Sequence, residues 1–150
     1  MIIFNTKVDD KTSKLFRGMV VNYIQTIDEE DVTSLQTIND VKAIMSEAVG
    51  NVNIHAYKED DTERNIKVTF DHAKENGYLY LYITVEDQGI GMQDVKKCME
   101  PLYSTVNNED RAGLGFTIME TLSDDILVSS NPNSGTIVRL VKKLGRYEEE

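Results

Sequence analysis

The sequence predicts an α/β fold, an α+β two-layer sandwich in which helices cover one face of a mixed, mostly antiparallel sheet. Two observations predict it. Residues 11–27 and 33–57 repeat apolar side chains at three- and four-residue steps, which is the pattern of amphipathic helices. Residues 65–72 and 78–86 alternate apolar and polar side chains on either side of Asn76-Gly77, a dipeptide typical of hairpin turns.

The elements before this hairpin follow from local composition. Residues 1–8 alternate and are rich in β-forming side chains, so a first strand is expected there. An acidic connector at 28–31 follows the first helix, and its residue types favour the N-cap of the second helix. That helix is expected to break around Asp40. Its apolar stripe consists of Leu35, Ile38, Val41, Ile44, Met45, Ala48, Val49 and Val52.

The elements after the hairpin are shorter. A short helix is expected at 93–99, and residues 100–112 are expected to form a mobile loop because they lack periodicity. A further helix is expected at 113–123. Two strands, at 126–129 and 136–142, then form a closing hairpin.

The composition is that of one globular domain spanning residues 1–150, with an acidic tail at about 146–150. The formal net charge of −10, from 26 acidic and 16 basic residues, argues against direct nucleic-acid binding and against binding to anionic membranes. No apolar run approaches the length of a membrane span. Cys98 is the single cysteine, so an internal disulfide is excluded and a reducing, cytoplasmic location is expected.

A polar stripe on the second helix is the first candidate for function. Glu47, Asn51 and His55 recur at four-residue intervals beside the apolar stripe. Their neighbours on the helix include Ala43 and Gly50 rather than the long polar side chains of a solvated face. This pattern predicts a face that a ligand or a mobile loop covers. The alternative is an ordinary surface, where a Glu and an Asn four residues apart are common.

Three glycine-containing turns are the second candidate. The motif Asp87-x-Gly89-x-Gly91 follows a strand, and its glycines permit close approach of the backbone to a ligand. The motif Arg111-x-Gly113-x-Gly115 opens a helix, where free N–H groups favour an anion such as phosphate. The turn Ser134-Gly135-Thr136 begins the last strand. Taken singly, each motif is also compatible with a structural turn, and none contains the Lys-Ser/Thr of a P-loop.

In this order the motifs resemble the GHKL nucleotide-binding superfamily, which implies the Bergerat ATP-binding fold. The resemblance is closer to the anti-sigma F factors of spore-forming bacteria, and it extends from about Phe4 to Leu144. It rests on four runs, which are Ser46–Tyr57, Asp87–Gly91, Pro101–Thr105 and Arg111–Glu120.

The resemblance implies a function. The similar proteins are serine kinases that hold a sporulation sigma factor of the sigma F type and phosphorylate its anti-anti-sigma factor. It therefore implies ATP and ADP as ligands, Mg²⁺ as the cation and a homodimer as the assembly. It implies no direct contact with nucleic acid or membrane.

The resemblance also implies roles for the polar stripe and for one residue of the first helix. Glu47 would be the catalytic base that takes the proton of a serine hydroxyl. Asn51 would bind Mg²⁺ and the nucleotide through its amide oxygen. Arg17 would contact the sigma factor, and it forms with Val21 a pair, expected to be exposed, that lies off the apolar stripe. His55 has no assigned role.

The nucleotide would be held by the glycine turns. Asp87 would accept from the adenine amino group, Gly89 and Gly91 would bring the backbone close to the ring, and Thr136 would support the adenine pocket. Gly113 and Gly115 would cradle the phosphates, and Arg111 would lie on a lid near the γ-phosphate.

Three rival functions remain open at this stage. A module that binds a sigma factor under nucleotide control without catalysis would not need Glu47 beside Asn51. A kinase of another stress-response sigma switch would be a second rival, which the runs at 101–105 and 115–120 disfavour. The catalytic half of a histidine kinase would require a dimerisation helix with a phosphoacceptor His, and neither His55 nor His72 lies in such a helix.

Overall fold

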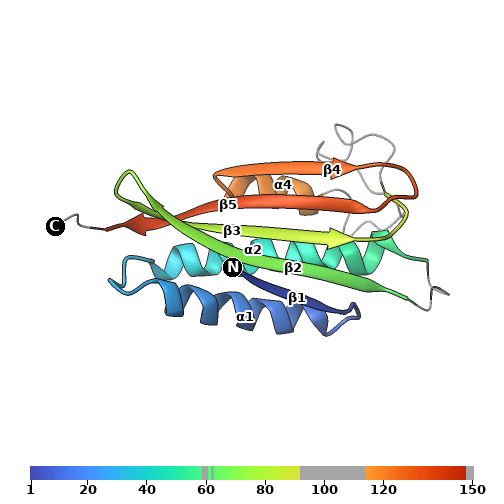
Figure 1. The fold of residues 1–150 in the computed structure, drawn as a ribbon, viewed down its shortest axis with the longest axis horizontal. Coiled ribbons are helices and arrows are strands. Elements are labelled where there is room, and N and C mark those ends of the chain that lie inside the picture. The colour runs from blue at the N-terminus through green and yellow to red at the C-terminus, as the bar shows by residue number, and fades with distance from the viewer. Residues whose placement is uncertain (59–60, 62, 92–113, 148–150) are drawn as a thin grey trace.

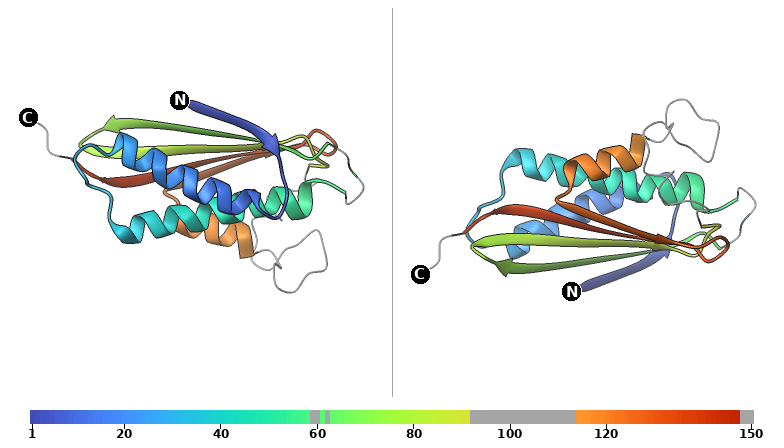
Figure 2. Two further views of the ribbon diagram at one scale, coloured as in Figure 1. Left: turned by 90° about the horizontal axis from the view of Figure 1, so that it is seen from below. Right: turned by 90° about the horizontal axis from the view of Figure 1, so that it is seen from above.

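The protein folds into two layers, with the helices packed on one face of a five-stranded sheet (Figure 1). The structure, a computed structural model, describes residues 1–58, 61, 63–91 and 114–147. Turned by 90°, it places the helices together on the same side of the sheet (Figure 2). The expected helix at 93–99 and loop at 100–112 lie outside the described residues, as does the end of the acidic tail.

The strands lie in the order β1-β2-β3-β5-β4, and each neighbouring pair is antiparallel. Their bounds are β1 Ile2–Lys7, β2 Asn65–Glu75, β3 Tyr78–Asp87, β4 Asp125–Ser130 and β5 Thr136–Arg146. The predicted antiparallel character is therefore confirmed, and no parallel pair occurs within the part of the chain that the structure describes. Asn76 and Gly77 have φ of 53° and 82°, which are the left-handed values that a tight hairpin turn requires.

Two strands are longer than predicted because aromatic and charged side chains continue the ladder. β2 runs past His72 to Glu75, which pairs with Tyr78. β5 runs past Lys142 to Arg146, and Lys143 Nζ lies 4.2 Å from the ring centroid of Tyr78. Such cation–π contacts stabilise strand ends that carry too few apolar residues to be recognised by alternation.

The helices bury their apolar stripes against the sheet. Their bounds are α1 Thr12–Ile27, α2 Leu35–Asn51, the π-helical turn η1 Val52–Ala56 and α4 Leu114–Leu122. The largest fully buried side chains include Phe16 of α1, Ile44 and Met45 of α2, and Phe70 of β2. Leu35, on the predicted stripe of α2, stays 74% exposed, and Leu15 of α1 stays 52% exposed.

The predicted break of α2 at Asp40 is wrong. The Asp40 side chain accepts from Gln36 Nε2 at 2.9 Å, one turn earlier on the same helix. It also lies 3.5 Å from Lys142 Nζ, in an ion pair that joins α2 to β5. Both contacts hold Asp40 inside a regular helix, and the helix changes geometry only after Asn51.

The N-cap of α2 also differs from the prediction. Ser34 caps the helix, because its hydroxyl accepts from Thr37 N at 3.1 Å. The acidic connector instead stabilises the turn before α2. The Asp28 carboxylate accepts hydrogen bonds from the backbone N–H groups of Val32 and Thr33 at 2.9 Å each. Burial acts to raise the pKa of Asp28, but the Thr33 side chain and the backbone N–H groups of Val32 and Thr33 together lower it.

We predict that Ser34→Ala lowers the free energy of unfolding by about 1 kcal/mol, because it leaves the Thr37 N–H without its capping acceptor. Urea denaturation monitored by circular dichroism measures the change. Ser129→Ala, at an exposed position of β4, is the matched control and should leave the midpoint nearly unchanged. Equal midpoints for Ser34→Ala and wild type would contradict the assigned cap.

Candidate functional site

Glu47 and Asn51 lie one turn apart near the end of α2, and both are half-buried. The sequence places them there because the apolar stripe of α2 faces the sheet, which turns this polar stripe toward α4. His55 follows one turn later, also half-buried, in η1. The first turn of α4 lies against Glu47 and Asn51, so a helix covers this part of the stripe, and the predicted cover by a ligand or a mobile loop stays a prediction.

Gly115 makes the contact between α4 and this stripe. A Cβ at this position would lie 3.0 Å from Glu47 Oε2 and 3.1 Å from Asn51 Oδ1. A side chain at this position would therefore crowd the Glu47 carboxylate and the Asn51 amide, which would have to shift by a few tenths of an ångström. The first N–H groups of a helix have no partner within the helix, and they favour negative charge near its N-terminus.

The Asn51 amide has an unsatisfied end. Its Nδ2 is buried and has no hydrogen-bond partner among the described residues. Buried polar groups in native proteins almost always have a partner, so an orphan at this position indicates a group that acquires one from a ligand or from its hydration shell. Thr117 Oγ1, one turn into α4, is a second buried atom without a partner in the same part of the chain.

The Asp87 turn forms the second cluster. Asp87 ends β3 with only 7% of its surface exposed, and its carboxylate accepts from Gly89 N at 2.8 Å. Burial raises the pKa of this carboxyl group, and hydrogen bonds from the backbone N–H groups of Gly89 and Thr136 offset part of the rise. A buried carboxylate that no described Lys or Arg side chain pairs with is an acceptor suited to a neutral donor such as an exocyclic amine.

Gly91 and Thr136 complete this cluster. Gly91 has φ of +71°, and a Cβ there would lie 1.9 Å from the carbonyl oxygen of Asn131, so the turn requires glycine. Thr136 pairs with Asp87 in the β3–β5 ladder and is buried. Its Oγ1 lies 2.8 Å from Ser130 Oγ, which fixes its rotamer.

The π-helical turn η1 joins the two clusters. Asn51 precedes it, and the carbonyl of its last residue, Ala56, accepts from Ile90 N at 2.8 Å. Gly89 is packed against the same carbonyl. Single π turns inside helices occur frequently at functional sites. The turn thus brings the Asp87 cluster to the end of the helix that carries Asn51.

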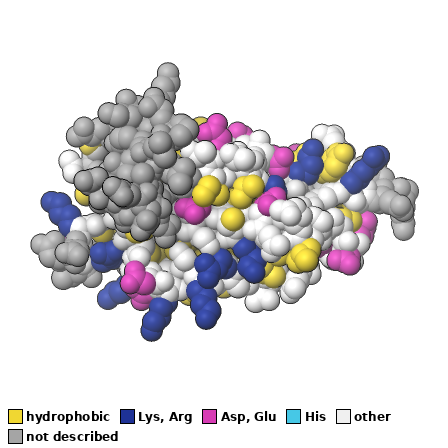
Figure 3. Space-filling view, turned by 180° about the vertical axis from the view of Figure 1, so that it is seen from behind, with side chains coloured by type: hydrophobic (Ala, Val, Ile, Leu, Met, Phe, Trp, Pro, Cys, Tyr) yellow, Lys and Arg dark blue, Asp and Glu magenta, His cyan; other side chains and the backbone are white. Residues whose placement is uncertain are grey.

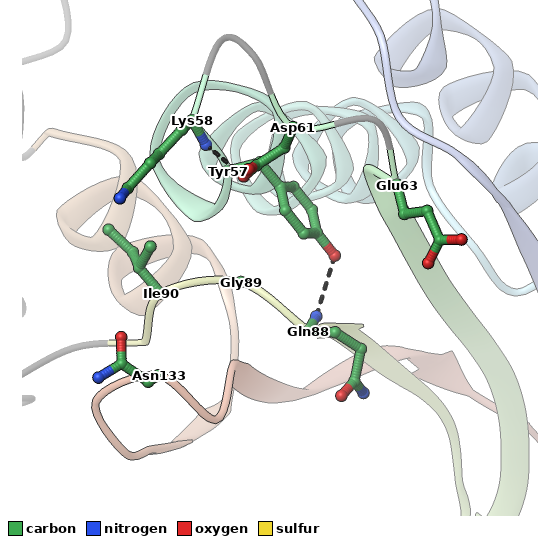
Figure 4. Close-up of a pocket in the computed structure, with 8 residues that line it drawn as sticks. All are labelled: Tyr57, Lys58, Asp61, Glu63, Gln88, Gly89, Ile90 and Asn133. Atoms are coloured by element: carbon green, nitrogen blue, oxygen red, sulfur yellow. Dashed lines mark hydrogen bonds between the residues drawn. The ribbon is translucent and has the colours of Figure 1, made fainter.

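Tyr57 is the last residue of the run Ser46–Tyr57, and the sequence alone predicts no role for it. Its hydroxyl donates to the Asn65 carbonyl and accepts from Gln88 N at 3.0 Å, so it ties the end of η1 to β2 and to the Asp87 turn (Figure 4). Burial is the largest cause of the raised pKa of Tyr57. An aromatic residue directly after a polar helical stripe was the signal available.

A pocket of about 440 Å³ opens beside Tyr57 (Figure 4). Among the predicted site residues that the structure describes, Gly89 lines this pocket, whereas Asp87 and Asn51 do not. Its walls are Tyr57, Lys58, Asp61, Glu63, Gln88, Gly89, Ile90 and Asn133. The pocket therefore adjoins the Asp87 turn and is distinct from the contact between Asn51 and Gly115.

Two predicted residues, Arg111 and Gly113, lie outside the described residues.

Arg17 lies on α1 and contacts α2, away from the Asp87 turn. It is half-buried rather than exposed, and Val21 is half-buried against the core, so the predicted exposed pair is wrong. The cause is the close packing of α1 on α2, which a single helix stripe does not reveal.

Comparisons with known proteins identify the family of similar chains. Residues 18–142 match the family described as "Histidine kinase-like ATPase domain". The chain is 36% identical over 132 residues to the anti-sigma F factor of Bacillus velezensis, which covers 87% of this chain and 83% of that protein. It is 41% identical over 113 residues to the anti-sigma F factor of Caldanaerobacter subterraneus subsp. tengcongensis, covering 75% of each.

A solved structure resembles the fold. The crystal structure of the RsbU and RsbW domains of Rv1364c from Mycobacterium tuberculosis superimposes with a TM-score of 0.63 at 17% identity. The match covers 99% of this chain and 35% of that longer chain.

Among the described residues, none of the helices has the length and apolar character of a membrane span.

We predict that Gly115→Ala separates stability from ligand binding. Alanine favours the helix by up to about 1 kcal/mol, so urea denaturation should show no loss of stability. Its Cβ would displace the Glu47 and Asn51 side chains, so affinity for ADP, measured by calorimetry, should fall. Gly18→Ala adds a methyl group where nothing lies within 4 Å and is the control expected to bind ADP normally. Wild-type affinity in Gly115→Ala would refute this reading of the contact.

Proposed function

The chain belongs to the anti-sigma F factor family and contains a histidine kinase-like ATPase domain, and on that premise we propose that it is an anti-sigma factor and an ATP-dependent serine kinase. It sequesters a sporulation sigma factor of the sigma F type. It phosphorylates a serine of the anti-anti-sigma factor that releases that sigma factor. It works as a homodimer in the cytoplasm, where bacterial sigma factors act.

One observation carries this proposal: the side chains of Glu47 and Asn51 meet the first turn of α4 at Gly115. This arrangement brings three groups together. The carboxylate can accept a proton, the amide can bind a metal ion, and the N-terminal turn of a helix favours an anion. Asp87, Gly89, Gly91 and Thr136 provide the adenine pocket at the other end of η1.

The residues present fit Mg²⁺ with a nucleotide. Mg²⁺ prefers oxygen ligands and is commonly held by few protein groups together with phosphates. Asn51 has an amide whose nitrogen is buried without a partner, and a half-turn of the amide brings its oxygen to the same place. When bound, the cation would neutralise charge that develops on the transferred phosphoryl group. Gly113, Gly115 and Arg111 would hold the phosphates.

Glu47 would act as the base. The substrate serine would lose its proton to the Glu47 carboxylate while its Oγ forms a bond to the γ-phosphorus of ATP. The bond between that phosphorus and the bridging oxygen of ADP would break, which leaves phosphoserine and ADP. The role of Glu47 is to accept a proton at a fixed position, and the role of Asn51 is to orient the phosphates.

The rival function, ATP binding without catalysis, would not require Glu47. A protein that only holds a sigma factor would need Asn51 and the adenine pocket, whereas a carboxylate beside Asn51 would add repulsion toward the phosphates. Arg17 would serve both functions, because it would contact the partner protein rather than the nucleotide.

We predict that Glu47→Gln lowers phosphorylation of the anti-anti-sigma factor by roughly 10²- to 10⁴-fold, because the amide cannot take a proton. ATP and sigma-factor affinity should persist in this variant. Asn51→Ala should reduce nucleotide binding and catalysis together, because it removes a metal ligand. Calorimetry with ATP and Mg²⁺, with transfer of labelled phosphate, measures both. A Glu47→Gln variant that phosphorylates its partner at the wild-type rate would favour the non-catalytic rival.

We predict that ADP affinity rises with pH through the raised pKa of Asp87, because a donor on adenine stabilises the ionised carboxylate. Asp87→Asn should abolish this dependence and lower affinity by roughly tenfold to a hundredfold. The same raised pKa makes the free energy of unfolding fall as pH rises from the ordinary value of 3.8 through the raised value.

Calorimetry between about pH 4 and about pH 8, a range that lies above the ordinary carboxyl pKa, measures the effect. Asp125→Asn makes the same chemical change at an exposed position of β4 and should retain the wild-type profile. A profile for Asp87→Asn that matches wild type would remove Asp87 from the adenine pocket.

A further inference from the structure

Arg17 joins α1 to the turn of α2 that carries Glu47. Its Nη1 donates to Ser46 Oγ at 3.0 Å, and Ser46 directly precedes Glu47 in the chain. Both side chains are half-buried. A docking residue on one helix is thus hydrogen-bonded to the residue next to the proposed base on another helix.

A second tie lies on the other side of the proposed catalytic pair. Asn53 Nδ2 donates to Asp10 Oδ1 at 2.8 Å, which links η1 to the residues just before α1. The helices run antiparallel, so residue 10 meets residue 53 and residue 17 meets residue 46. The segment with Glu47 and Asn51 is therefore hydrogen-bonded to α1 at one end and to the residues just before α1 at the other.

The surface around Arg17 is open and basic. Gly18 is exposed, and a Cβ on it would meet nothing within 4 Å, so a partner can approach the α1 backbone closely. Lys14, one turn before Gly18, is exposed as well. From the helical side, Lys and Arg side chains gather along the part of the molecule where α1 lies (Figure 3). Arg17 forms no ion pair with any residue that the structure describes.

We propose that Ser46 is a positioning residue that holds the Arg17 guanidinium for a carboxylate of the partner protein. This inference rests on the proposed function, since the partner is the sigma factor that the kinase sequesters. A guanidinium held by one neutral hydroxyl keeps its remaining N–H donors for a planar acceptor, which a carboxylate supplies. Docking on Arg17 would act on Ser46 and so on the turn that carries Glu47, which couples partner binding to the catalytic helix.

A double-mutant cycle tests the proposal. The full-length protein with ADP and Mg²⁺ is titrated against a purified sigma F-type factor from the same genome. Ser46→Ala should weaken binding by roughly threefold to tenfold, the effect of one hydrogen bond, and Ser46→Thr should restore it. In the Arg17→Ala background, Ser46→Ala should have no further effect, because the group that Ser46 positions is absent.

Arg139→Ala removes the same charge from an exposed position of β5 and is the matched control, expected to bind the sigma factor as wild type does. ADP affinity is also measured for every variant. In Ser46→Ala, the loss of sigma-factor affinity should exceed any change in ADP affinity. Additive effects of Ser46→Ala and Arg17→Ala would overturn the proposal while the proposed function stands. A wild-type protein that binds no sigma factor would instead overturn the proposed function.

Discussion

One backbone hydrogen bond, from Ile90 N to the carbonyl of Ala56, holds the two halves of the candidate site together. It exists because Gly89 has no side chain, as a Cβ there would lie 2.0 Å from the same carbonyl oxygen. Asn51 lies at one end of the π-helical turn, and this hydrogen bond fixes the other end against the Asp87 turn. This contact helps to set the spacing between Asn51, the proposed metal ligand, and Asp87, the proposed adenine acceptor.

The π-helical turn itself needs support from outside the helix. Arg64 provides it, because its Nη2 donates to the Asn53 carbonyl at 2.6 Å and to Asn53 Oδ1 at 3.2 Å. Tyr57 adds a second support through its contacts to Asn65 and Gln88. Residues with no proposed part in chemistry therefore determine where Asn51 lies, which is how a marginal local geometry is kept in a folded protein.

Much of the fold and part of the site could be predicted from the sequence. Periodicity located α1, α2 and the Asn76-Gly77 hairpin, because each depends on local spacing. The polar stripe of Glu47 and Asn51 was found for the same reason. Contacts between distant residues were not predictable: the pairing of Asp40 with Lys142 removed an expected break.

Likewise, Arg17 was expected on the surface, but it contacts Ser46 and is half-buried. The π geometry of η1 depends on Arg64 and Tyr57, which belong to neighbouring segments, so helical spacing alone gave no sign of it. Residues 92–113, with Arg111 and Gly113, lie outside the described residues, and the roles of these two residues remain predictions from the family resemblance.

The central claim is that the protein transfers phosphate to a serine of its antagonist. Mass spectrometry of a purified anti-anti-sigma factor, after incubation with this protein, ATP and Mg²⁺, tests it most directly. We expect one phosphoserine, formed only when all components are present. An antagonist that binds the protein and remains unmodified under these conditions would contradict the claim.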